Sequence, residues 1–243
     1  MKRFDNTDDP RRRVLIRALA AGLFSTTLPG GRALAADIFG NKPAKLPQGQ
    51  SIYRVSGKVL VNGVAATLGT RIGANDTVET PKDGELVFVV GENAMIVRGG
   101  SRVELRAAQK DSLLISGLRL LTGKLLSVSR NRPMEVSTQV ATIGIRGTGF
   151  YLESDPEQTY FCTCYGTTEV AANNDSGNRK TMVSKHHDQP IYIVGGAQTG
   201  QSIRNAPFIN HTDQELMLIE TLVGRTPPFV FPGNDYKAPR RDY

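Results

Sequence analysis

From Ile52 onward the sequence alternates short apolar runs with turn residues, at a spacing of about 8–12 positions. Runs such as 57–62, 85–90 and 94–98 are rich in Val, Leu and Ile, and Asn62-Gly63 ends the first of them. No segment before residue 200 shows the 3.6-residue apolar period of an amphipathic helix. Many short strands with regular turn signals are typical of sandwiches and barrels, so the sequence predicts an all-β domain.

Further along the chain, the sequence predicts short strands that follow one another in twos, with a short interruption between the first and the second. The predicted strands cover 118–122 and 123–129, then 141–145 and 150–154, and finally 160–165 and 169–172. Gly123 and Gly147, at or near two of these breaks, suit turns that need a positive φ or a close backbone approach.

The apolar pattern changes near the C-terminal end, where residues 213–223 carry apolar side chains at helical spacing. Thr212 stands directly before this segment and Glu215 follows three positions later, which is the pattern of a capping box. Gly224 is a helix stop signal. The sequence therefore predicts one short helix, followed by an extended tail over residues 226–243 that contains four prolines.

The first 35 residues have the features of a cleavable export signal. Basic residues come first, and an apolar stretch from about residue 18 to 28 follows, shorter than the roughly 20 residues that span a bilayer. Ala33-Leu34-Ala35 supplies a small-residue cleavage site, so we expect cleavage near Ala35. The segment Arg12–Arg17 resembles the twin-arginine consensus, which predicts export and a periplasmic mature protein. A general secretory signal and an uncleaved anchor are the alternatives.

Most of the chain's positive charge belongs to this N-terminal segment. The whole chain carries a formal charge of +7, of which +4 lies in residues 1–35, so the remainder carries +3. No basic stripe interleaved with aromatic residues appears, which argues against a nucleic-acid partner. No later run of 18 apolar residues is present, so we expect no integral membrane anchor after signal cleavage.

Dispersed motifs in the β region resemble those of the FecR domain family and occur in the same order as in that family. They are Val55–Val59 with Asn62-Gly63, Leu68–Ile72, Asp76–Thr80, Ser101–Leu105, Leu121–Leu125, Ser137-Thr138 and Ile145–Phe150. The last of these, Ile-Arg-Gly-Thr-Gly-Phe, is the most specific. The resemblance implies a jelly-roll-like β-sandwich over residues 51–172, with a linker at 36–50 before it and an extension at 173–243 after it.

The founding members of that family are membrane-spanning signal transducers that control a sigma factor in iron-citrate uptake. Their cytosolic segment, membrane helix and receptor-docking domain have no counterpart in this sequence. We therefore expect only the extracytoplasmic module to carry over, and we expect its Ile145–Phe150 motif to build the fold rather than a catalytic site.

All cysteines and histidines of the chain fall within about 50 residues after that motif. They are Cys162, Cys164, His186, His187 and His211. Residues two apart on a strand point the same way, so both sulfurs would lie on one face. His186 and His187 would point to opposite sides, and only one of them need bind. Two thiolates and two imidazoles form a tetrahedral set suited to zinc, and copper would also be accepted.

Asp188 and Asp213 follow His187 and His211 closely, and we expect them to orient those imidazoles. Three other interpretations of the cysteines remain open at this point. A Cys162–Cys164 disulfide would close a small, strained ring that invites redox chemistry. A second alternative is unliganded core cysteines with histidines on the surface. A Cys–His nucleophile would need a third orienting group and an oxyanion site.

The sequence thus favours a non-enzymatic periplasmic binding or structural protein, with a metal site that joins the β domain to the C-terminal extension. The expected partner is an envelope protein or glycan. A thiol redox protein that uses the Cys-x-Cys pair, and an envelope interaction scaffold without metal, are the alternatives.

Overall fold

The computed structural model describes residues 43–109, 112–129 and 132–229. The predicted export signal, the first part of the predicted linker and the end of the predicted tail lie outside the described residues. Among those described, no helix combines the length and the apolar character needed to cross a bilayer.

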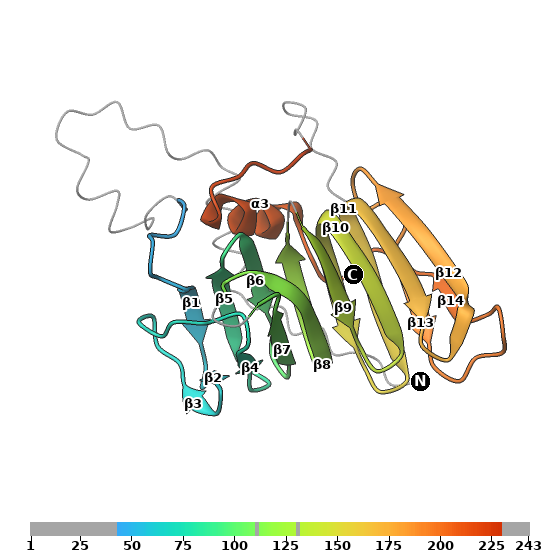
Figure 1. Cartoon of the computed structure of the whole chain (residues 1–243), viewed down its shortest axis with the longest axis horizontal. Coiled ribbons are helices and arrows are strands. Elements are labelled where there is room, and N and C mark those ends of the chain that lie inside the picture. The colour runs from blue at the N-terminus through green and yellow to red at the C-terminus, as the bar shows by residue number, and fades with distance from the viewer. Residues whose placement is uncertain (1–42, 110–111, 130–131, 230–243) are drawn as a thin grey trace. The chain divides into compact units, whose positions relative to one another are not determined.

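The described chain forms one hydrogen-bonded sheet and a single short helix near its C-terminal end (Figure 1). The elements are β1 (Ile52–Ser56), β2 (Leu60–Val61), β3 (Val64–Ala65), β4 (Thr77–Glu79), β5 (Glu85–Val90), β6 (Asn93–Val97), β7 (Arg102–Ala107), β8 (Ile115–Val128), β9 (Pro133–Ser137), β10 (Ala141–Ser154), β11 (Gln158–Ala172), β12 (Asp175–Ser184), β13 (Ile191–Val194), β14 (Ile203–Asn205) and α3 (Asp213–Leu222).

The main path of the sheet runs β14-β13-β11-β10-β9-β8-β7-β4-β2-β3, with β5 and β6 joined through β8, β1 through β5, and β12 through β11. All pairings are antiparallel except that between β8 and β9. Three strands lie beyond residue 172, where the family resemblance ends, and they extend the same sheet. The predicted all-β class with one short helix is confirmed.

Three long strands, β8, β10 and β11, each change partners midway. The first part of β8 pairs with β7 and its second part with β6 and β10. Likewise β10 passes from β9 to β8, and β11 passes from β13 to β12. Each change occurs close to a glycine at positive φ, namely Gly123, Gly147 and Gly166. Glycine adopts this conformation without the steric cost that other residues meet, so the strands can twist sharply there.

Because of these changes, the two halves of the sheet form two layers around a large apolar core. Side chains alternate along each strand, so that Phe88 and Phe150 face this core while their neighbours Val87 and Tyr151 face the opposite side. The result is sandwich-like, but both layers belong to one continuous sheet.

A second apolar cluster lies on the outer face of the layer that contains β5, β6, the second part of β8 and the second part of β10. Here α3 lies across β6 and β8 (Figure 1). Leu216, Ile219 and Leu222 are buried on the side of α3 that faces the sheet. The predicted capping box is present, with the Thr212 and Glu215 side chains each bonded to the other residue's backbone. The C-terminal segment thus covers a sheet face that would otherwise expose apolar side chains to water.

Candidate metal centre

The two cysteines lie on the outer face of β11, beneath the C-terminal segment. Tyr160, Cys162 and Cys164 belong to the outer cluster, whereas Phe161 between them faces the main core. Both cysteines are fully buried and carry free thiols. The strand periodicity therefore places both sulfurs on one face, as the sequence predicts.

His187 reaches the sulfurs from the turn that follows β12. Its backbone lies in the left-handed region (φ 54), and its N–H donates to the Cys164 carbonyl at 2.9 Å. The sequence predicted that Asp188 would orient the His187 imidazole. Instead its carboxylate accepts hydrogen bonds from the backbone N–H groups of Lys185 (2.7 Å) and His186. This tight turn directs His187 inward and leaves His186 half-exposed.

His211 is held by the segment that leads into α3. Its Nδ1 lies 2.7 Å from the Ile209 carbonyl oxygen, and its ring stacks on Tyr151 with centroids 4.5 Å apart and planes at 19°. The ring of Phe208 also contacts His211, at 4.4 Å between centroids. The buried guanidinium of Arg98 donates to the backbone carbonyl of Asn210, the residue before His211. The position of this imidazole is therefore fixed by contacts that involve no metal.

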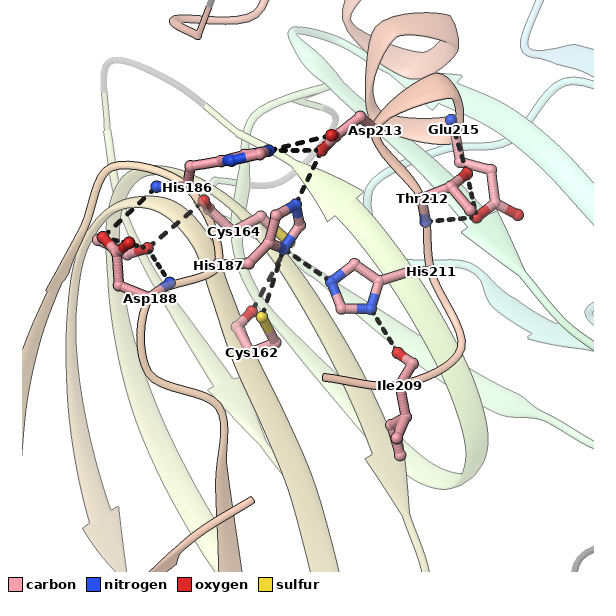
Figure 2. Close-up of polar contacts among 11 residues, drawn as sticks. Cys162, Cys164, His186, His187, Asp188, Ile209, His211, Thr212, Asp213 and Glu215 are labelled. Atoms are coloured by element: carbon pink, nitrogen blue, oxygen red, sulfur yellow. Dashed lines mark hydrogen bonds and ion pairs between the residues drawn. The ribbon is translucent and has the colours of Figure 1, made fainter. Parts of the chain in front are cut away.

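These elements bring four potential ligands together, as Figure 2 shows. Cys162, Cys164, His187 and His211 each offer one donor atom, and all four atoms lie within 4.8 Å of one another. His187 Nδ1 lies 3.6 Å from Cys162 Sγ and 3.1 Å from His211 Nε2. Zinc–ligand bonds of roughly 2.0–2.3 Å in a tetrahedron imply donor separations of roughly 3.3–3.8 Å. These two separations are close to that range.

The hydrogen bonds on the far side of each imidazole determine which nitrogen carries a proton. His187 Nε2 faces the Asp213 carboxylate at 2.9 Å, and His211 Nδ1 faces the Ile209 carbonyl. Both oxygens are acceptors, so both nitrogens are N–H donors. If both rings were neutral, the lone pairs of His187 Nδ1 and His211 Nε2 would point at each other and repel, because the two nitrogens are 3.1 Å apart. A cation between the two nitrogens, either a proton or a metal ion, removes this repulsion.

The same geometry shifts the acid–base properties of the group. Burial alone would lower the pKa of His187, but the Asp213 carboxylate and the Cys162 sulfur outweigh it and raise that pKa to about 9. Burial alone would raise the pKa of Cys162, but hydrogen bonds from Cys164, His187 and His211 hold that pKa well below its ordinary value. Burial and the neighbouring Cys162 raise the pKa of the Cys164 thiol. Without metal, these shifts favour a protonated His187 beside a Cys162 thiolate.

His186, the remaining predicted ligand, lies outside this set of four. Its Nε2 is 3.0 Å from each oxygen of Asp213, which is itself buried. Asp213 thus contacts His186 and His187, whereas the sequence predicted that it would orient His211. The capping box places Asp213 in the first turn of α3, but only the tertiary fold shows which imidazole it meets.

Comparisons with known proteins give little further guidance. No family model matches the sequence, and no curated protein matches it. Two crystal structures of a candidate anti-sigma factor from Parabacteroides distasonis ATCC 8503 align with the chain at 12% identity and a TM-score of 0.42. They cover 60% of this chain and 74% and 73% of their own chains. A TM-score below 0.5 does not define a shared fold family, so the resemblance to FecR domains stays a prediction.

Proposed function

We propose that the protein is a non-enzymatic, extracytoplasmic binding and structural protein in which one zinc or copper ion joins the sheet to the C-terminal segment. The ion is held by Cys162 and Cys164 of β11, by His187 of the turn after β12 and by His211 before α3. The observation that carries this proposal is the 3.1 Å approach of His187 Nδ1 to His211 Nε2, with an acceptor on the far nitrogen of each ring.

Acceptors of this kind are typical of metal-bound histidines, because they fix the tautomer and the orientation of the ring. Four donors without an open position are typical of structural zinc sites rather than catalytic ones. The ligands also come from three separate parts of the chain, so a bound ion cross-links them. Such a cross-link stabilises the folded state by the free energy of metal binding.

Metal analysis of untagged protein tests this proposal. We expect about one zinc or copper ion per chain, lost in His187→Ala and retained in His186→Ala. This pair of variants is a matched control, since the two histidines are adjacent and only His187 belongs to the set of four. Metal-free protein with Cys162 and Cys164 oxidised to a disulfide would contradict the proposal and favour the redox alternative.

A second candidate function is thiol nucleophile chemistry, because Cys162, His187 and Asp213 are aligned in the order of a catalytic triad. Complete burial of Cys162 argues against it, since a substrate carbon must reach the sulfur. Alkylation with iodoacetamide separates the two functions. We expect no labelling of the native protein until the metal is removed, whereas rapid labelling of metal-loaded protein at Cys162 would support the nucleophile.

The localisation is part of the same proposal. The twin-arginine-like segment at Arg12–Arg17 supports export to the periplasm after folding, a route compatible with metal loading in the cytoplasm. The resemblance to FecR domains supports an envelope protein or glycan as the partner. We expect the exported protein to begin at Ala36, and Arg12→Lys with Arg13→Lys to leave the precursor in the cytoplasm. N-terminal sequencing and fractionation would check both outcomes.

A further inference from the structure

The four proposed ligands are closed off from solvent. Cys162, Cys164 and His211 have no exposed surface, and the His187 side chain is 2% exposed. An ion that reaches them in the folded protein must therefore cross a polar region that can replace its water ligands, because a charged ion does not pass through apolar packing.

Among the described residues, those around His211 offer no such route. Tyr151 stacks on the ring and Phe208 contacts it at 4.4 Å. Its Nδ1 is occupied by the Ile209 carbonyl oxygen. The sulfurs lie within the same apolar cluster, with Tyr160 and the buried residues of α3 around them.

The side of His187 that faces Asp213 is different. The Asp213 carboxylate is buried and lies 2.9 Å from His187 Nε2, and beyond it lies His186, whose side chain is 36% exposed. Figure 2 shows Asp213 beside His186, with the His187 ring between Asp213 and the other ligands. A continuous row of metal-binding side chains thus leads from the surface to the buried centre.

The donor atoms in the outer part of this row are also spaced closely enough to bind one ion. His186 Nε2 lies 3.0 Å from both oxygens of Asp213, and donor atoms of His186, His187 and Asp213 lie within 4.8 Å of one another. Bonds of roughly 2.0–2.2 Å to nitrogen and oxygen allow one ion to bridge donors at such separations. Phe229 packs against the His186 ring, with centroids 4.9 Å apart, and holds it beside the carboxylate.

We propose that His186 and Asp213 form an outer cation site that receives the metal ion from solvent and passes it to the four buried ligands. This inference rests on the proposed metal centre. Binding at the outer site uses one imidazole nitrogen and carboxylate oxygen, which suit divalent ions such as zinc and cobalt. The ion then exchanges these donors for two thiolates and two imidazoles, the displaced protons of Cys164 and His187 pass to solvent, and Asp213 again accepts the hydrogen bond of His187 Nε2.

The rate of metal loading tests this proposal. Metal-free, reduced full-length protein is mixed with Co(II), and the thiolate-to-cobalt absorption band is followed by stopped flow. The band reports the buried centre alone, because the outer site has no sulfur. We expect His186→Gln to slow the growth of the band by about tenfold or more, with an unchanged final absorbance.

The choice of variants distinguishes a ligand from an orienting residue. The amide of His186→Gln retains a hydrogen-bond donor for Asp213 but is a poor ligand, so an orienting role predicts the wild-type rate. Lys185→Ala, an exposed neighbour on the same turn, is the matched control and should load at the wild-type rate. Equal rates for wild type and His186→Gln would overturn the outer site. Absence of the band in wild type would instead overturn the buried centre itself.

Discussion

At the scale of single residues, the choice between His186 and His187 depends on one backbone angle. The sequence predicts that adjacent histidines point to opposite sides, but it does not tell which one faces the sulfurs. In the structure, the left-handed conformation of His187 and the hydrogen bonds of Asp188 turn His187, and not His186, towards the sulfurs. The sequence could not predict this, because the turn depends on the pairing of β11 with β12.

Metal affinity should depend on pH because protons compete for the same donor atoms. The raised pKa values of His187 and Cys164 favour one proton on each of these groups, whereas the lowered pKa of Cys162 favours its thiolate. Binding should therefore release about two protons, and affinity should rise steeply with pH up to about 9, where His187 titrates, and less steeply above it, where the Cys164 thiol still holds its proton. Zinc binding in weak buffer with a pH indicator measures this number, and release of no protons would contradict the assignment.

Arg98 has a residue-scale role that the sequence did not indicate. It donates to Glu215 at 2.8 Å and to the Asn210 carbonyl, and its guanidinium lies 5.2 Å from the centre of the Tyr151 ring. Arg98→Met removes both of these hydrogen bonds at a largely buried position, so we expect a loss of about 2–4 kcal/mol in urea unfolding. Arg102→Met removes two more exposed ion pairs, with Glu79 and Glu104, and should cost under about 1 kcal/mol. Similar losses for both variants would contradict this role.

At the scale of secondary-structure elements, most strands follow from the alternation of apolar residues, and the capping box correctly predicts where α3 begins. The long strands β8, β10 and β11 do not follow in the same way. The sequence predicts a pair of short strands in place of each. The breaks fall close to Gly123, Gly147 and Gly166, where the structure has a change of partner within one strand. Local sequence marks the bend, but only long-range pairing shows that the strand continues.

Gly123 provides a test of these bends. Its φ is +92, and an added Cβ would lie 2.2 Å from Ser101 Oγ and 2.5 Å from Ser101 Cα. We expect Gly123→Ala to lower the free energy of unfolding by about 2–4 kcal/mol, through both backbone strain and overlap. Gly100→Ala shares the positive φ (+71) but has open space around the new methyl group. It should cost about 1 kcal/mol, and an equal loss in the two variants would refute a steric role for the bend.

At the scale of the whole described molecule, the proposed metal centre and α3 both attach the C-terminal segment to the same face of the sheet. Each proposed ligand contributes to attaching the C-terminal segment, so metal removal should loosen that segment before the sheet unfolds. A ligand present at 1,000 times its Kd adds about 4 kcal/mol, which corresponds to a rise in Tm of about 8–16 °C for a domain of this size. We therefore expect a chelator to lower Tm by that amount.

Limited proteolysis of the chelator-treated protein locates the change. We expect faster tryptic cleavage after Arg204 and Arg225, which flank the segment that carries His211 and α3. The Cys162→Ser, Cys164→Ser double variant provides the control, since its cleavage pattern should not respond to the chelator. Loss of the whole sheet at the same rate would show that the ion supports the entire fold and not the segment alone.

The central claim is that one ion binds two sulfurs and two imidazole nitrogens at this centre. X-ray absorption spectroscopy at the edge of the bound metal, on untagged protein, measures those ligands directly. For zinc we predict two sulfur scatterers at about 2.3 Å and two nitrogen scatterers at about 2.0–2.1 Å. A metal shell of oxygen and nitrogen alone, or metal-free protein in which Cys162 and Cys164 are oxidised, would contradict the claim.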